Sequence, residues 1–354
     1  MKKIYIRNSQ AMALLLFAAL SLSVTVDAIA RRDMPDDNLS YPVLFVSKPD
    51  PHSGKSTTGS GFYFRFGDSD YFVTAQHVLF KTSTQLAKEL TNFPIPRYLS
   101  HRLSYDAESQ MLTFIGVMTT KEKEDLLKTA PHPTELNKAI EQLWRDSQKL
   151  QLINAEATLF SYSILMNNSV SEIELKLAEL YSDGNIKYHP SSDVAVIRLG
   201  TMQRIKDRPK TAQVSFNKGI NVKQWAERGY LSSDNTKLFN EVLVSNAVYV
   251  FGYPTSITNQ NAFLDIKLPL VRKGIVAGKN EELKLIILDC PLNNGNSGGL
   301  VTEVENVPSY VNFKAIGLIT NIVPVSYDNR SINNSGYSVV VPMDRVMEVV
   351  NLFK

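Results

Sequence analysis

The sequence has a single cysteine, Cys290, in 354 residues, and this excludes any internal disulfide. A chain of this length can instead be stabilised by burying its own apolar side chains. Histidine is also scarce, and the five present share no metal-ligand spacing with one another or with Cys290. The sequence therefore predicts no metal site and no cofactor.

Long runs of one charge are missing as well. The formal net charge is only +3, and no basic run is long enough to form a patch for nucleic acid or for an anionic membrane surface. Internal repeats and low-complexity tracts are also absent from the sequence. Neither nucleic acid nor a membrane surface is therefore an expected partner.

The one long apolar run lies near the N-terminus, from Ala11 to about Val26, after several basic residues. It is shorter than the roughly 18 or more apolar residues of a membrane-spanning helix, which makes an anchor the weaker interpretation. The run ends in Ala28-Ile29-Ala30, two small residues flanking a larger one. This pattern predicts a signal peptide over residues 1–30 that is cleaved after Ala30. The mature chain, residues 31–354, is then secreted or periplasmic, is not inserted in the membrane, and is typical of bacteria because it lacks disulfides.

Short aromatic and β-branched segments recur along the mature chain with turns between them. The first two, residues 41–47 and 61–66, flank a turn rich in Pro, Gly, Ser and Thr and predict a β-hairpin. Further strands are predicted at residues 71–74, 173–180, 193–199, 248–251, 285–288 and 315–319. Many short strands separated by turns indicate a sandwich or barrel.

Two stretches have a different character. Residues 81–165 contain an amphipathic segment from Thr134 to about Glu156, with apolar spacings of three, four and seven, and this stretch predicts a helical insertion. Residues 201–245 mix charged and apolar residues and predict a surface insertion at the boundary between two halves of the chain. A short helix is predicted from Met343 to Leu352.

Three motifs together predict nucleophilic catalysis. A serine hydroxyl needs a base to remove its proton, and the base needs a third group to orient it. His77 directly follows a predicted strand, Asp193 opens another, and Ser297 lies in the run Gly295-Asn296-Ser297-Gly298-Gly299. In so glycine-rich a turn, the amides of Gly295 and Ser297 can converge on an oxyanion.

These motifs, in the order His, Asp, Ser, resemble those of trypsin-like serine proteases. Within that superfamily the bacterial HtrA/DegP-type protease domain is the most similar, with matching landmarks from Gly59-Ser60-Gly61-Phe62 to Val339-Val340-Val341-Pro342. The resemblance implies an all-β, chymotrypsin-like fold of two six-stranded antiparallel β-barrels. It also implies a serine endopeptidase that cleaves protein or peptide substrates through an acyl-enzyme, with His77, Asp193 and Ser297 as the catalytic triad.

The chain departs from the family in three places. The stretch between His77 and Asp193 is several times longer than in the family's plain domain, and no PDZ module is expected after the terminal helix. Asn296 stands where digestive trypsin-like enzymes have an Asp that pairs with a newly cut N-terminus. Because a neutral amide cannot form that salt bridge, we expect activation without such a cleavage.

The substrate pocket is predicted by the same resemblance. Pro291, six residues before Ser297, offers no anion to a basic substrate side chain. Ile319, Thr320 and Asn321 are expected to line the pocket wall, which favours an uncharged, small to medium residue before the cut.

Two other functions remain open on the sequence. The first is a pseudoprotease, which would keep the fold as a binding scaffold without turnover. The second is an esterase, which would use the same triad on non-peptide substrates.

Overall fold

The computed structural model describes residues 41–49, 56–86, 88, 94–106, 109–129, 135–163, 169–205, 208–224, 229–258, 264–307, 310–327 and 331–353. The predicted signal peptide, residues 1–30, lies outside the described residues. Within the described residues, no helix has both the length and the apolar character to cross a membrane.

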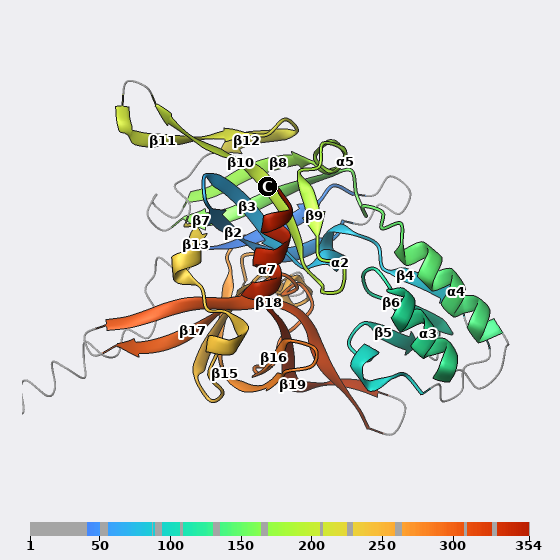
Figure 1. The fold of residues 1–354 in the computed structure, drawn as a ribbon. Helices are drawn as coiled ribbons and strands as arrows, with labels where there is room; N and C mark the ends of the chain where they lie inside the picture. Colours follow the sequence, from blue (N-terminus) through green and yellow to red (C-terminus); the bar gives the residue numbers. More distant parts are fainter. Residues whose placement is uncertain are drawn as a thin grey trace, which may run out of the picture.

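The second half of the chain forms a closed six-stranded antiparallel barrel, in the order β14-β15-β16-β19-β18-β17 (Figure 1). Its strands are β14 (Ala247–Gly252), β15 (Leu270–Asn280), β16 (Leu285–Asp289), β17 (Leu300–Val307), β18 (Tyr310–Tyr327) and β19 (Ser331–Pro342). Apolar side chains such as Val250, Leu288 and Val340 fill its interior because successive residues of a strand point to opposite faces.

The first half is a curved ten-stranded sheet whose main path runs β11-β10-β3-β2-β1-β7-β8-β12. Its strands are β1 (Pro42–Ser47), β2 (Thr58–Phe66), β3 (Ser69–Thr74), β7 (Glu156–Ser163), β8 (Ser169–Lys176), β9 (Ile186–Tyr188), β10 (Ala195–Ile205), β11 (Arg208–Phe216), β12 (Ile220–Gln224) and β13 (Leu231–Ser232). The predicted all-β class with two barrel-like halves is confirmed. The first half differs in strand number, because β8 and β10 pair with β12 and β11 at the two ends of the path.

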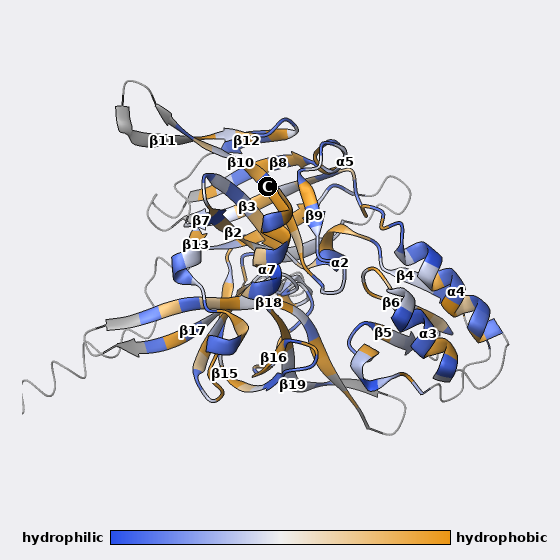
Figure 2. Ribbon diagram, in the orientation of Figure 1, coloured by the Kyte–Doolittle hydropathy of each residue, from blue (hydrophilic) through white to orange (hydrophobic). Residues whose placement is uncertain are grey.

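One core joins the two halves. It contains Phe62 and Val196 of the first sheet, Phe251 of the barrel, and Val346 of the terminal helix α7 (Met343–Val350). Helix α7 contacts β9 and β10 as well as β18 and β19, and Figure 1 shows it where the halves meet. Figure 2 shows hydrophobic residues concentrated along the central strands.

The insertion lies in sequence between β3 and β7 of the first sheet. It contains a small sheet of its own, which the sequence did not predict. The order is β4-β6-β5, with β4 (Ser83–Leu86), β5 (Leu103–Asp106) and β6 (Met111–Phe114). Helices α3 (Thr120–Thr129) and α4 (Glu135–Ser147) pack on it through a separate core that includes Leu126 and Leu143. Strands of four residues are too short to show a clear alternation, whereas the period of α4 is plain.

The bounds of three predicted elements differ in the structure. The insertion ends before residue 156 and not at residue 165 as predicted, since residues 156–163 form β7 of the main sheet. The strand predicted at residues 173–180 ends at Lys176, and helix α5 (Leu177–Ser182) follows because Leu177 and Leu180 are both buried at helical spacing. Much of the surface insertion predicted over residues 201–245 is strand, in β10, β11 and β12.

Candidate active site

His77 lies in the short helix α2 (Gln76–Leu79), directly after β3. The end of β3 is held by the Thr74 hydroxyl, which donates a hydrogen bond of 2.7 Å to the Ser60 carbonyl. Val78 and Leu79 are buried, whereas the His77 side chain keeps 26 % of its surface exposed. The turn therefore anchors the chain through its apolar residues and leaves the imidazole accessible.

Asp193 precedes β10 and binds His77 through both carboxylate oxygens. Oδ2 lies 2.6 Å from His77 Nδ1, and Oδ1 accepts the His77 backbone N–H at 3.0 Å. A carboxylate accepts only, so Nδ1 must carry the proton and donate it to Oδ2. Nε2 of the neutral ring is then an acceptor, which is the form a general base requires.

Ser297 lies in a turn that only glycine permits on both sides. Gly295 and Gly298 have φ of 100° and 84°, a region that other residues rarely adopt. A Cβ atom on Gly295 would lie 2.5 Å from the Tyr253 carbonyl oxygen, and one on Gly298 would lie 2.0 Å from that of Ser60. The turn is tied to β2 by the Ser60 N–H, which donates to the Ser297 carbonyl at 2.8 Å.

Two amides of the turn, those of Gly295 and Ser297, are the predicted oxyanion-hole donors. Within the described part of the chain, the N–H groups of Gly295 and Ser297 donate no hydrogen bond. The Asn296 side chain is buried and donates to the Asn293 carbonyl at 2.9 Å, so it braces the turn from within. Two unpaired N–H groups beside a serine form the donor pair that an oxyanion needs.

His77 and Ser297 line one cavity of about 600 Å³. The wall from the barrel includes Leu292, Asn293 and Asn294 together with the predicted pocket residues Ile319, Thr320 and Asn321. Pro291, also predicted for the pocket, is exposed and does not line this cavity. The next three residues, Leu292, Asn293 and Asn294, line the cavity instead.

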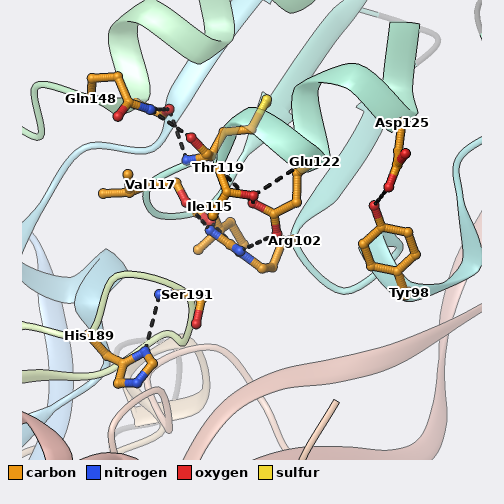
Figure 3. Close-up of polar contacts among 12 residues, drawn as sticks. Tyr98, Arg102, Ile115, Val117, Thr119, Glu122, Asp125, Gln148, His189 and Ser191 are labelled. Atoms are coloured by element: carbon orange, nitrogen blue, oxygen red, sulfur yellow. Dashed lines mark hydrogen bonds and ion pairs between the residues drawn. The ribbon is translucent and has the colours of Figure 1, made fainter. Parts of the chain in front are cut away.

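A buried histidine that the sequence did not single out holds the loop before Asp193. His189 Nδ1 accepts the Ser191 N–H at 3.1 Å (Figure 3), and Nε2 lies 2.7 Å from Oε2 of Glu348 on α7. Burial lowers the pKa of His189, which keeps Nδ1 free to accept. No local motif marks this residue, because its partner Glu348 is distant in the sequence.

A buried arginine fixes the loop of the insertion that packs on the His77 turn. Arg102 is 6 % exposed, and it donates to Glu122 and to the Ile115 and Val117 carbonyls at 2.6, 3.0 and 2.6 Å (Figure 3). Gly116 lies within this loop, and a Cβ there would be 2.8 Å from Oε1 of Gln76, the residue before His77. The insertion therefore packs directly on the turn that carries the imidazole.

The His77 pKa sets the expected pH dependence of the site. Burial lowers this pKa, but the charge and hydrogen bond of Asp193 outweigh burial, and the net pKa is raised above 6.5. A base must be neutral, so we expect activity to fall as the pH drops through a midpoint above 6.5. A profile of kcat/KM from pH 5 to 9 measures this midpoint.

Two further results test whether Asp193 raises the pKa of His77. Stability should change in the opposite sense, because the pair stabilises the fold fully below pH 6.5 and loses this contribution as the pH rises through the raised pKa. An acid limb with a midpoint below 6.5 would show that Asp193 does not govern the imidazole.

Among the described residues, no group of three or more His, Cys, Asp or Glu side chains is placed to hold a metal ion. No family model and no curated protein sequence matches this chain. In structure the chain is similar to the protease Anisep from Arthrobacter nicotinovorans, with a TM-score of 0.40 and 9 % identity, over 89 % of this chain and 95 % of that one. At so low a similarity, the activity has to be inferred from the geometry of the site itself.

Proposed function

We propose that this protein is a serine endopeptidase of the trypsin-like type, most similar to the HtrA/DegP-type domain. The single observation that supports this most is the double hydrogen bond between Asp193 and His77 in the cavity that Ser297 also lines. In the proposed reaction, His77 Nε2 takes the Ser297 proton as Oγ attacks the substrate carbonyl. The amides of Gly295 and Ser297 then hold the oxyanion.

The remaining steps follow from the same groups. His77 gives its proton to the leaving amine, and an acyl-enzyme forms on Ser297. Water, deprotonated by His77, then hydrolyses the ester and restores the serine. Export by residues 1–30 and protein or peptide substrates outside the cytoplasm complete the proposal.

A fluorophosphonate probe tests the proposal, because it phosphonylates only a serine activated by a base. The purified mature protein should take up one probe per chain, mapped by mass spectrometry to Ser297, and should lose casein cleavage in proportion. Labelling without cleavage of any peptide would favour the esterase. The absence of labelling in a folded protein would favour a scaffold without catalysis.

A further inference from the structure

The insertion forms one wall of the cavity that holds His77 and Ser297. Strand β6 alternates, so that Leu112 and Phe114 are fully buried in the core of the insertion, while Thr113 and the following Ile115 line the cavity. Thr84, which pairs with Thr113 across β4 and β6, lines it too. The small sheet is therefore two-sided, with one face in its own core and the other toward the substrate.

Lys81 lies at the base of this wall, between α2 and β4. Its backbone N–H donates to the Gln151 carbonyl at 2.9 Å, which fixes the chain at this point, and the residue lines the cavity. Lys81 is exposed, and within the described residues it forms no ion pair. The ammonium is thus free to bind a ligand.

Among the described residues that line the cavity, none carries a negative charge that could neutralise Lys81. The other described lining residues are apolar, hydroxyl or amide side chains, apart from His77, and none is acidic. A cation beside neutral hydrogen-bonding groups attracts a carboxylate and repels a basic side chain. The hydroxyls of Thr84 and Thr113 add donors that a carboxylate oxygen can accept.

We infer that Lys81 and the insertion wall select substrates with an acidic side chain near the scissile bond. This inference rests on the proposed peptidase function and names its substrate class. The acidic residue lies against the insertion, whereas the opposite wall, with Ile319, takes an uncharged residue. The insertion therefore acts as a specificity element of the cleft.

Internally quenched peptides that differ only by Glu, Gln or Lys at each position around the cut test the inference. We expect wild-type protein to prefer Glu over Gln at one position by roughly fivefold in kcat/KM, as for a partly exposed ion pair. The preference should shrink at high salt because solvent ions screen it. Lys81→Gln should abolish the preference, and Lys81→Glu should reverse it in favour of Lys at the same position.

Lys149→Glu is the matched control, since Lys149 is an exposed lysine that follows α4 of the insertion and does not line the cavity. This variant should retain the preference for Glu. Equal cleavage of the Glu and Gln peptides by a wild-type protein that labels at Ser297 would overturn the inference and leave the proposed function intact. Retention of the preference in Lys81→Gln would also overturn it. A protein that neither labels nor cuts any peptide would overturn both.

Discussion

Ser297→Ala is expected to reduce casein cleavage by about a million-fold and to remove fluorophosphonate labelling, because it deletes the attacking atom. The fold should not change. In the structure it is the Ser297 backbone carbonyl that is bound, by the Ser60 N–H, and alanine keeps that carbonyl. Residual cleavage should come from the amides of Gly295 and Ser297, which do not depend on the side chain.

Two controls separate loss of chemistry from loss of structure. Ser109→Ala changes an exposed serine outside the cavity and should leave labelling and cleavage unchanged. Ser60→Ala should instead lower the melting temperature, since the Ser60 hydroxyl donates to the Gly295 carbonyl at 2.7 Å and accepts the Tyr253 N–H at 2.8 Å. Wild-type labelling of the Ser297→Ala protein would refute the assignment of the nucleophile.

Asp193→Asn is expected to lower kcat by about ten-thousand-fold. The two oxygens of Asp193 face two donors, the backbone N–H and Nδ1–H of His77. An asparagine has one acceptor and one donor, so in either orientation its NH₂ group faces one of these donors. Relief of that clash by moving the ring proton to Nε2 leaves His77 unable to take the serine proton.

Stopped assays with a chromogenic ester over long times can measure so large a loss. Asp183→Asn, in the exposed turn after α5, provides the matched control and should retain full activity. A loss of less than tenfold in Asp193→Asn would show that another group orients His77.

The candidate catalytic motifs could be recognised in the sequence because each is local. The glycines around Ser297, the small residues before His77 and the apolar strand after Asp193 all lie within a few positions of the residue concerned. The structure brings these three residues together through strand pairing, β3 with β10 and Ser60 with Ser297. The all-β class could also be predicted, because each short strand is marked by a local pattern of aromatic and β-branched residues.

Features that depend on distant partners were not predictable. The contact between His189 and Glu348 spans most of the second half of the chain, and neither residue belongs to a motif. Arg102 likewise gains its role only through burial against Glu122 and the loop at Gly116. The prediction of Pro291 for the pocket rests on its distance in sequence from Ser297, and sequence distance does not determine which side chains of an irregular segment face a cavity.

The docking of α7 bears on when the candidate active site is complete during synthesis of the chain. Glu348 braces the loop that carries Asp193, and α7 supplies Val346 to the core shared by both halves. In chain order α7 comes after every described strand. Because translation runs from the N-terminus, a ribosome must finish all of these strands before the loop that carries Asp193 is held by Glu348. The loop that carries Asp193 can therefore reach its final form only after the whole described chain has been synthesised.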